Sequence, residues 1–456
     1  MPWIYRMAVK IMLLALPLYI YVGLRLSTAI AKATKSSRFP ISKKTARIIV
    51  FAVILWFYLW PITLEIYYLT GNFRHLFVYS PQLQWQDYLV LFPAWCGLIS
   101  VVEIFPYFLV LDIFAGMRRL KIFSSREKKS DKKQPGKPWV SYLKVGIALF
   151  FLFYVGVRTY FDTSHVRIST SEVAIENLPK ELQGLRLCLF GDIHANRYTQ
   201  GKKLDKLRNT LQTGNDDLIF FTGDLISKGP DYINQAINAI SNPKGKLASA
   251  ACMGDHDYWT APQLIARELK KCGWEFLQNQ HHLISYKGHQ ILVTGITYVY
   301  SRRISDYELE RLLKNAPKAD LKILIVHQPR EFLVETAAKY GYHLFLGGHT
   351  HGGEVVNHFF GIPFSPGLLE TRYCWGQHRF KGLTVVITNG IGRTLAALRY
   401  HAPSEITKLV LTSGSEDQGD SFRENRPPGP PAKAFDYKLF QPSIGIYTKS
   451  IDLPFP

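Results

Sequence analysis

Gly347-Gly348-His349-Thr350-His351-Gly352-Gly353 directly follows the apolar run HLFL at residues 343–346. Four shorter clusters between residues 191 and 327 repeat this arrangement, because each places aspartate or histidine directly after an apolar run. These clusters are Gly191-Asp192-Ile193-His194, Gly223-Asp224, Gly254-Asp255-His256-Asp257 and Val326-His327. Short apolar runs bounded by glycine are typical of buried strands. The sequence therefore predicts a series of buried strands that each end in a metal-type ligand.

Carboxylates and imidazoles together suit a two-metal site, in which neighbouring divalent ions share ligands and clamp a phosphoryl group. A single histidine is usually a packing or surface residue, and a single aspartate often caps a turn. Five clusters with the same relation to apolar runs are not expected by chance. Imidazole ligands suit Mn, Zn, Fe or Ni, and the oxygen ligands widen the choice. We therefore expect two divalent metal ions as cofactor, with their identity left open.

Between about Leu185 and Leu411, the chain resembles the calcineurin-like metallophosphoesterases, in particular their membrane-attached bacterial branch. The signature of that family is Asp-x-His, Gly-Asp, Gly-Asn-His-Asp/Glu, a single histidine and Gly-His-x-His. The segment NGIGRTLAALRYHAPSEI at residues 389–406 also resembles the closing segment of the membrane-attached branch. The resemblance implies an α/β (α+β) fold, a four-layer double β-sandwich flanked by helices. It also implies an enzyme, a metal-dependent phosphoric ester hydrolase.

The same resemblance, carried over position by position, implies seven metal ligands and one catalytic residue. The implied ligands are Asp192, His194 and His351 for one ion, Asp224 as the bridge between both ions, and Asp255, His327 and His349 for the other ion. His256 would protonate the leaving oxygen. A histidine has a pKa range that suits this task, provided that another group orients the ring.

The chain departs from the family pattern in three places. Asp255 stands where the family usually has asparagine, so the site is less positive by one unit. Ser227 stands where related enzymes often have an aspartate that orients the acid histidine. His343 and Glu354 flank the last cluster where aspartate and glutamine are common. All the implied ligands are present, so these departures concern rate and substrate more than the site itself.

Apolar runs are concentrated in the first 160 residues, although the hydrophobic fraction of the whole chain, 47%, is ordinary. Four runs approach the roughly 20 residues that a helix needs to cross a bilayer. These runs are Met7–Leu24, Ile48–Tyr68, Tyr88–Leu111 and Val140–Val157. The first run lacks a small-residue cleavage site and precedes further spans, so we expect it to be retained. The predicted organisation is a transmembrane region of about four helices at 1–160, a phosphoesterase domain at 161–412 and a Pro-rich tail at 413–456.

Lysine and arginine in the connecting loops predict the orientation. Residues 25–47 carry seven of them and residues 118–137 carry nine, whereas residues 69–87 carry only Arg74. Cationic loops stay in the cytoplasm. We therefore expect an integral protein of the inner (plasma) membrane with both termini and the catalytic domain outside the cytoplasm. Most of the net charge of +20 lies in the first 160 residues, which indicates topology and anionic lipid and no nucleic-acid partner.

Two further features bear on the membrane. Glu103 lies inside the third apolar run, where an ionisable group is costly, and we expect it to pair with Lys144 of the fourth run or to face a wet interior. The stretch HFFGIPFSPGLLETRYCWGQHRF at 358–380 is unusually apolar for a loop that follows metal ligands. One interpretation is packing against the sandwich. The other is an apolar rim that admits an acyl chain or dips into the bilayer.

The sequence is consistent with three functions. The leading hypothesis is a membrane-anchored dinuclear-metal phosphoesterase that hydrolyses a phosphodiester, pyrophosphate or phosphomonoester, with lipid-linked substrates among the candidates. The second is a nucleotide-sugar-lipid pyrophosphatase, a reaction that is commonly cytoplasmic and so conflicts with the loop charges. The third is a membrane-attached metal-binding sensor without turnover, which Asp255 and Ser227 favour. The sequence leaves the substrate, the native metals and the oligomeric state open.

Overall fold

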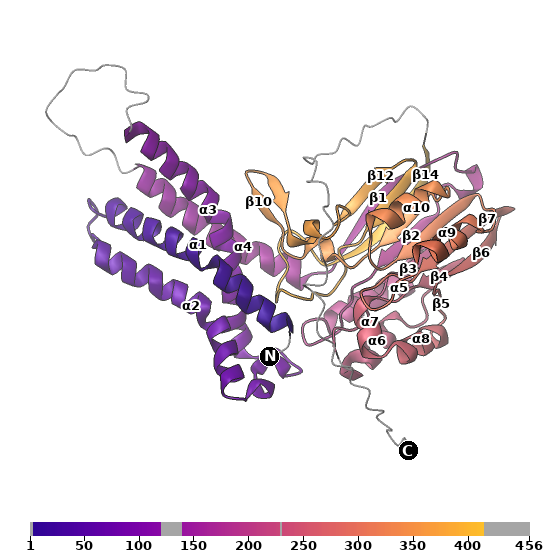
Figure 1. Ribbon diagram of the computed structural model, residues 1–456, viewed down its shortest axis with the longest axis horizontal. Helices are drawn as coiled ribbons and strands as arrows, with labels where there is room; N and C mark the ends of the chain where they lie inside the picture. The colour runs from indigo at the N-terminus through magenta and orange to yellow at the C-terminus, as the bar shows by residue number, and fades with distance from the viewer. Residues whose placement is uncertain (1–2, 120–138, 229, 415–456) are drawn as a thin grey trace.

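Long apolar helices form the N-terminal part of the molecule, beside a β-rich body (Figure 1). The computed structural model describes residues 3–119, 139–228 and 230–414. The long helices are α1 (Trp3–Ala33), α2 (Lys43–Leu69), α3 (Phe92–Arg119) and α4 (Trp139–Ser164), and a π-helical turn at Asp87–Leu91 leads into α3. All four helices are long and apolar enough to cross a membrane, as the sequence predicted. The lysine-rich loop at 124–138 and the tail from 415 lie outside the described residues.

Two six-stranded mixed sheets form the β-rich body. The first sheet has the order β1-β14-β2-β3-β4-β5, and the second has the order β12-β13-β9-β8-β7-β6. The strands of the first sheet are β1 (Arg167–Glu176), β2 (Arg186–Phe190), β3 (Leu218–Phe221), β4 (Ala248–Ala251), β5 (Glu275–Phe276) and β14 (Glu405–Gly414). Those of the second are β6 (Gln280–Tyr286), β7 (His289–Ile296), β8 (Leu321–Val326), β9 (Leu344–Gly347), β12 (Gly376–Phe380) and β13 (Leu383–Ile387).

The apolar side chains of the body form three buried layers. One core, which includes Leu187, Val293 and Leu409, lies between the two sheets. A second lies between the first sheet and the helices α5 (Lys202–Thr213), α6 (Ile233–Ile240) and α8 (Pro262–Lys271). A third lies between the second sheet and the helices α9 (Asp306–Lys314) and α10 (Glu331–Lys339). This is the four-layer α/β arrangement of two sheets with flanking helices that the sequence predicted.

The sheet topology brings the ligand-bearing strand ends to one edge. Strands β2, β3 and β4 are parallel neighbours, and so are β8 and β9. The carboxyl ends of parallel neighbours meet at the same edge of a sheet. Each of the five clusters with aspartate or histidine follows one of these strands within a few residues. The short helix α7 (Asp255–Thr260) begins at the cluster after β4.

The helices are joined to the body by buried polar contacts as well as by α4. The Arg197 side chain donates to the carbonyl oxygens of Phe77 and Gln82, at 2.6 and 2.9 Å, and pairs with Asp87. The Asp162 carboxylate accepts from the backbone N–H of His401 at 2.7 Å. Apolar residues at 396–398 also pack into the core of the helical bundle. The helices and the body therefore share a continuous interface.

The predicted pairing of Glu103 with Lys144 is wrong. Lys144 instead pairs with Asp112 at 2.5 Å. Glu103 is 1% exposed, and its Oε1 accepts from Asn357 Nδ2 at 3.1 Å and from Tyr400 OH at 3.2 Å. The Glu103 carboxylate is therefore satisfied by residues of the β-rich body and not by a neighbouring span.

A two-stranded hairpin, β10 (Asn357–Phe359) and β11 (Ile362–Phe364), extends from the body along α3 (Figure 1). Its apolar side chains do not enter the sandwich, since Phe360 and Ile362 are 58% and 54% exposed. Packing against the sandwich is therefore the wrong interpretation for this part of the apolar stretch. The later part does pack there, because Tyr373 and Cys374 are buried.

Candidate metal centre

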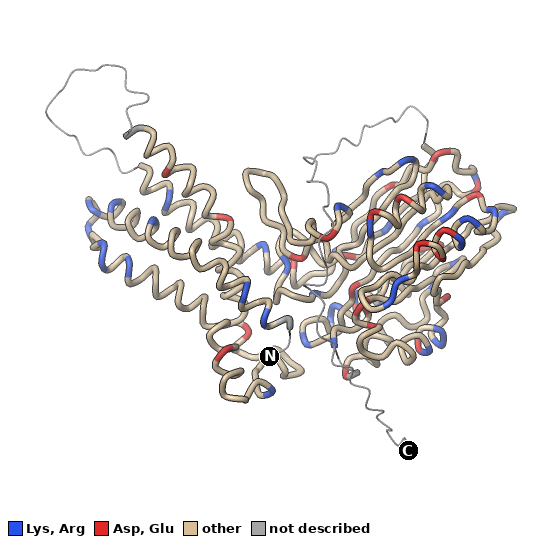
Figure 2. Tube along the Cα trace, in the orientation of Figure 1, with Lys and Arg blue, Asp and Glu red and all other residues tan. Residues whose placement is uncertain are grey.

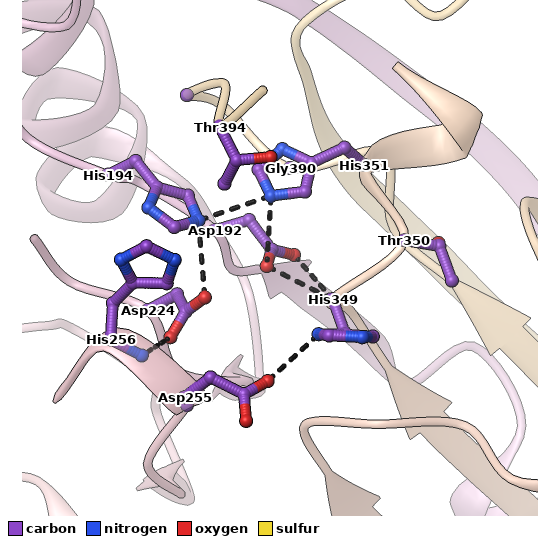
Figure 3. A network of polar contacts seen from close by, with 12 residues as sticks. Asp192, His194, Asp224, Asp255, His256, His349, Thr350, His351, Gly390 and Thr394 are labelled. Atoms are coloured by element: carbon purple, nitrogen blue, oxygen red, sulfur yellow. Dashed lines mark hydrogen bonds and ion pairs between the residues drawn. The ribbon is translucent and has the colours of Figure 1, made fainter. Parts of the chain in front are cut away.

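The structure brings all eight predicted site residues into one buried cluster at the strand ends. Figure 3 labels all of them except His327. Four overlapping groups each place three ligand atoms within 4.8 Å of one another. These groups are Asp192, His194 and His351; His194, Asp224 and His256; Asp192, Asp224 and His327; and Asp255, His327 and His349. Most of these side chains are fully buried, with His256 and His349 partly open. The cluster therefore combines buried side chains with partial solvent exposure at His256 and His349.

Asp224 occupies the middle of the cluster. Its Oδ2 lies 3.2 Å from Nε2 of His194 and 3.3 Å from Nε2 of His327. These two histidines belong to different three-residue groups, one with Asp192 and His351 and the other with Asp255 and His349. One carboxylate oxygen thus faces a ligand from each half of the cluster, which is the position that a shared ligand requires.

The remaining contacts hold each half together. Nε2 of His351 lies 3.1 Å from Nε2 of His194, and Nδ1 of His349 lies 3.3 Å from Nε2 of His327. The Asp192 carboxylate accepts the backbone N–H of His349 at 2.9 Å, which links the first strand cluster to the last. The five loops therefore fix one another through their own ligand residues.

Left-handed backbone conformations are concentrated at this cluster. Asp192, His194, Asp224, His349 and His351 all have φ between 44° and 71°. Residues other than glycine adopt this region rarely, and strained backbone tends to occur where the surroundings enforce it for function. The loops are therefore shaped to direct ligand side chains inward at some cost in local stability.

The loop after β3 is held by Asp257, which the sequence analysis did not assign. The Asp257 carboxylate accepts the backbone N–H groups of Asp224 and Leu225, both at 2.8 Å, and of Gly254 at 3.0 Å. Gly254 has no room for a side chain, because a Cβ there would lie 2.1 Å from Oδ1 of Asp224. Asp257 thus positions Asp224 through main-chain contacts.

His256 has an orienting partner despite the serine at position 227. Nδ1 of His256 lies 2.5 Å from the backbone carbonyl oxygen of Ser227 and donates to it, since a carbonyl can only accept. The ring stands beside His194, with centroids 4.6 Å apart. The backbone oxygen of Ser227 therefore takes the place of the aspartate side chain that related enzymes have at this position. Nε2 of His256 is left for proton transfer.

Both oxygens of Asp255 accept hydrogen bonds from outside the cluster. Oδ1 accepts the backbone N–H of Tyr300 at 2.6 Å, and Oδ2 accepts Nε2 of Gln328 at 2.8 Å. Oδ2 also lies 3.0 Å from Nδ1 of His349. An asparagine can offer only one acceptor oxygen. The Asp255 carboxylate can therefore accept from both Tyr300 and Gln328, whereas an asparagine could accept from only one of them through its single oxygen.

Glu370 is a site residue that sequence reasoning missed. It follows the 3-10 turn η7 (Pro366–Leu369), and its Oε1 lies 3.1 Å from Nε2 of His349 and 2.6 Å from the hydroxyl of Tyr300. Arg330 pairs with the same carboxylate. Metal-ligating histidines commonly donate their second ring N–H to a carboxylate, which fixes the ring and its tautomer. Glu370 can do this for His349, whose Nδ1 faces the cluster.

Arg399 supports the other half of the cluster. It is 1% exposed, and its Nη1 donates to the carbonyl oxygen of His351 at 3.1 Å and to that of Ala402 at 2.9 Å. Its Nη2 lies 3.3 Å from Nδ1 of His351. The segment at 389–406 that resembles the membrane-attached branch therefore contributes a buried guanidinium behind His351.

The two flanking departures lie away from the ligand atoms. Nδ1 of His343 accepts the backbone N–H of Lys322 at 3.0 Å. The Glu354 carboxylate accepts the backbone N–H groups of Thr394 and Leu395, at 2.9 and 3.3 Å. Glu354 thus shapes the loop that precedes Arg399, and His343 caps a strand.

Burial and neighbouring charge set the protonation of the cluster. Burial lowers the pKa of His194 to about 4 and holds the pKa of His351 well below its usual range. Burial acts to raise the pKa of Asp224, but His327 and His194 outweigh it and hold that pKa well below its usual range. Burial acts to lower the pKa of His327 and of His349 as well, but neighbouring carboxylates hold the pKa of His327 well above its usual range and raise that of His349 to about 9. Ligand imidazoles must be neutral, so metal binding would release protons from these two histidines.

The donor set fits divalent metal ions. It contains four imidazoles and three carboxylates in two overlapping halves, the mixture that suits Zn, Fe, Mn or Ni. Nε2 of His194 faces Oδ2 of Asp224 at 3.2 Å, and Nε2 of His351 faces Oδ1 of Asp192 at 3.7 Å. Imidazole nitrogens and carboxylate oxygens therefore converge within the same part of the cluster. The residues could therefore hold two ions of a type that the ligands alone do not specify.

Comparison with known proteins agrees with this chemistry. Residues 185–353 match the family model described as Calcineurin-like phosphoesterase. The chain is similar to "Transmembrane protein with metallophosphoesterase domain" of Danio rerio, with 26% identity over 70% of this chain and 74% of that protein. It is similar to "Uncharacterized metallophosphoesterase YkuE" of Bacillus subtilis, with 27% identity over 57% and 90%. It is also similar to "Phosphodiesterase YaeI" of Escherichia coli, with 26% identity over 50% and 82%.

Proposed function

We propose that the chain is a membrane-anchored dinuclear-metal phosphoesterase. It carries a calcineurin-like metallophosphoesterase domain, and members of that family are metal-dependent hydrolases. Four apolar helices precede this domain. Its substrate is a phosphodiester, pyrophosphate or phosphomonoester, and we favour one linked to a lipid. The position of Asp224 Oδ2 between His194 and His327 carries the proposal, because it allows one carboxylate to serve two ions. The partners are therefore the membrane and a phosphoester, with no nucleic acid.

We assign the ligands as the family resemblance implies. Asp192, His194 and His351 would hold one ion, Asp255, His327 and His349 would hold the other, and Asp224 would serve both. Two divalent ions, when bound, polarise a phosphoryl group and acidify water. The protein contributes buried, pre-oriented ligands and the supporting contacts from Asp257, Glu370 and Arg399.

His256 is assigned as the acid that protonates the leaving oxygen. Its Nδ1–H is committed to the Ser227 carbonyl, so Nε2 carries the proton that is transferred. A positioned general acid contributes about 10²–10⁴-fold to the rate. This contact also weakens the sensor hypothesis, because Ser227 supplies the orienting group that a turnover-deficient site would lack.

The proposal is tested with the purified full chain in lipid nanodiscs. We expect about two metal ions per chain, and hydrolysis of bis(p-nitrophenyl) phosphate or p-nitrophenyl phosphate with at least one of Mn, Zn, Fe or Ni. Metal binding without hydrolysis of either ester under any metal would overturn the enzyme assignment and favour the sensor. A nucleotide-sugar lipid added to the same assay examines the pyrophosphatase alternative.

We propose that the catalytic domain lies outside the cytoplasm. Lysine and arginine gather at the bend between α1 and α2, at the end of the bundle away from the body (Figure 2). Cationic ends remain cytoplasmic. A reporter active only outside the cytoplasm should give signal when fused to the carboxyl terminus, and no signal within 124–138. The reverse pattern would favour the cytoplasmic pyrophosphatase.

The proposed division of the chain is a transmembrane region at 1–160, a phosphoesterase domain at 161–412 and a tail at 413–456. Helix α4 runs to Ser164 and β14 runs to Gly414, so both boundaries lie close to the ends of these elements. The tail beyond residue 414 lies outside the described residues. A protein truncated after residue 414 should therefore keep its hydrolytic activity.

A further inference from the structure

The β10–β11 hairpin leaves the metal cluster and returns to it. It begins a few residues after His351, and Ser365 Oγ donates to the carbonyl oxygen of Gly353 at 2.7 Å to close its base. The chain then passes through η7 to Glu370, which contacts His349. Both ends of the hairpin are therefore joined to the cluster.

Glu103 establishes the depth of the hairpin along the spans. It lies near the middle of the candidate span Asp87–Met117, about 24 Å along the helix from Asp87 at 1.5 Å per residue. Its Oε1 accepts Asn357 Nδ2 and the backbone N–H of His358, both at 3.1 Å. Strand β10 therefore runs beside the middle of α3.

The tip of the hairpin gives a second measure of depth. The ring of Phe360 lies 5.0 Å from that of Tyr107, which in turn lies 5.4 Å from Phe151 of α4. Phe151 is seven residues from Lys144 and seven from Arg158, about 10 Å along the helix from each charge. The tip therefore lies midway between the two charged levels of α4, where hydrocarbon would surround a membrane span.

At one level of the hairpin, the outward backbone N–H groups are either hydrogen-bonded or absent. The hairpin loop has two residues, so Phe359 and Ile362 form the hydrogen-bonded pair that closes it. The backbone groups of the next pair, His358 and Pro363, therefore point outward, away from the partner strand. The outward N–H of His358 is bound by Glu103, and Pro363 has no N–H. Lipid does not tolerate unpaired backbone donors. His358 and Pro363 therefore leave no unpaired backbone N–H at this level of the hairpin.

The exposed side chains of the hairpin are apolar. Phe360, Ile362 and Phe364 are 58%, 54% and 43% exposed, and they lie at the depth that Glu103 and Phe151 define. Water would be a poor solvent for such a patch, whereas acyl chains at this depth would cover it. The depth of these three side chains thus favours lipid acyl chains as the molecules that cover them.

We infer that the β10–β11 hairpin is inserted in the bilayer, that its apolar face binds the acyl chains of a membrane lipid, and that the substrate is a phosphoester carried by such a lipid. The last part rests on the proposed function. The acyl chains lie along Phe360 and Ile362, and the phosphoester is directed toward the hairpin base and the cluster. Glu103 holds the hairpin in this position.

Insertion is tested without turnover. A photoreactive benzoylphenylalanine replaces Phe360 in the full chain, which is placed in nanodiscs of phosphatidylcholine and phosphatidylglycerol and irradiated. Tyr307, which is 74% exposed on α9 far from the helices, is the matched control position. We expect lipid adducts at position 360 and none at 307. Equal adduct yields, or none at 360, would overturn insertion whether or not the protein is an enzyme.

The substrate part is tested by rate ratios. Phosphatidic acid, phosphatidylglycerol and an isoprenoid pyrophosphate are supplied in nanodiscs, and each rate is divided by that for the soluble aryl ester. We expect the double variant Phe360→Ser/Ile362→Ser to lower this ratio at least tenfold for the lipid that is hydrolysed, and Tyr307→Ser to leave it unchanged. An unchanged ratio in the double variant would overturn the assignment.

The outcomes also separate this inference from the proposed function. Hydrolysis of the soluble ester without hydrolysis of any lipid ester would overturn the lipid substrate and leave the phosphoesterase standing. Hydrolysis of neither would overturn the phosphoesterase and the lipid substrate together. In that case, lipid adducts at position 360 would still support the inserted hairpin.

Discussion

The metal cluster and the junction between hairpin and helices are built in different ways. The cluster joins loops that each carry a short motif, and its proposed ligands contact one another closely, as Asp224 does at 3.2 Å from His194 and 3.3 Å from His327. The junction joins residues that are 254 positions apart, Glu103 and Asn357, through one carboxylate and a set of ring contacts. Chemistry is thus encoded locally, whereas its placement against the membrane depends on distant contacts.

This difference predicts two classes of variant. Changes in the cluster should reduce the hydrolysis of every substrate and the binding of metal. Changes at the junction should leave metal binding intact and alter stability or the preference for lipid. A variant that crosses these classes would show that the two regions are coupled more tightly than their contacts indicate.

The largest effect is expected for Asp224→Asn. One residue serves both halves of the cluster, so we expect activity on the soluble diester to be lost and bound metal to fall below two ions per chain. Metal content and hydrolysis are measured on the same sample. Asp231→Asn, an exposed aspartate on the same loop, is the control and should match the wild type. Full activity with two ions retained would rule out the shared ligand.

His256→Ala should lower the rate about 10²–10⁴-fold on an ester with a poor leaving group, with both metals retained. An ester with a good leaving group should be affected less, because it needs no proton. Ser227→Ala is the matched control, since it keeps the carbonyl oxygen that orients His256 and should stay within a few-fold of the wild type. An unchanged rate in His256→Ala would show that another group is the acid.

The apolar runs predicted buried strands that end in metal-type ligands, whereas the double β-sandwich and the role of each ligand were implied by the family resemblance. Apolar runs bounded by glycine identify buried strands, and parallel neighbours bring their carboxyl ends together, so the position of a ligand after each run is informative. The four spans were predictable from apolar length alone. These features depend on residue type and short-range order, which a single sequence displays.

The supporting contacts were not predictable in this way. The partner of His256 is the carbonyl oxygen of Ser227, and every residue has such an oxygen, so position 227 pointed wrongly to a missing group. Glu370 acts from an irregular segment 21 residues after His349. Glu103 carried a signal, as a carboxylate within a span, but its partner on the hairpin is 254 residues away. Long-range partners of this kind require the tertiary fold.

Glu370→Ala should weaken metal binding in the half that contains His349, by about 10–100-fold for loss of an outer-shell partner. Glu370→Gln keeps an acceptor for the His349 ring and should recover part of this loss. Metal titration by calorimetry measures both. Glu335→Gln, an exposed position on α10, is the control. Wild-type affinity in Glu370→Ala would mean that Asp255 and His327 hold His349 without help.

Asp255→Asn should have two opposite effects on catalytic efficiency, each of a few-fold. Removing one negative charge makes the site more positive, and at about 4 Å in a water-like dielectric this is worth ~1 kcal/mol, or about fivefold in favour of an anionic ester. The same change sacrifices one of the hydrogen bonds from Tyr300 and Gln328 and weakens metal binding. Kinetics across metal concentrations separate the two effects. Lower efficiency at saturating metal would contradict the electrostatic part.

The smallest effect is expected at the junction. Tyr400→Phe removes one of three donors to Glu103 and should lower stability by about 1 kcal/mol, the usual net value of one hydrogen bond. Glu103→Leu should cost more, because Asn357 Nδ2 and the His358 N–H then lose their buried acceptor as well. Thermal unfolding in nanodiscs measures both, with Tyr307→Phe as the exposed control. Metal content should not change in either variant. If Glu103→Leu unfolds at the wild-type temperature and position 360 still forms lipid adducts in it, apolar contact with the bilayer and α3 alone holds the hairpin, and the carboxylate is not its anchor.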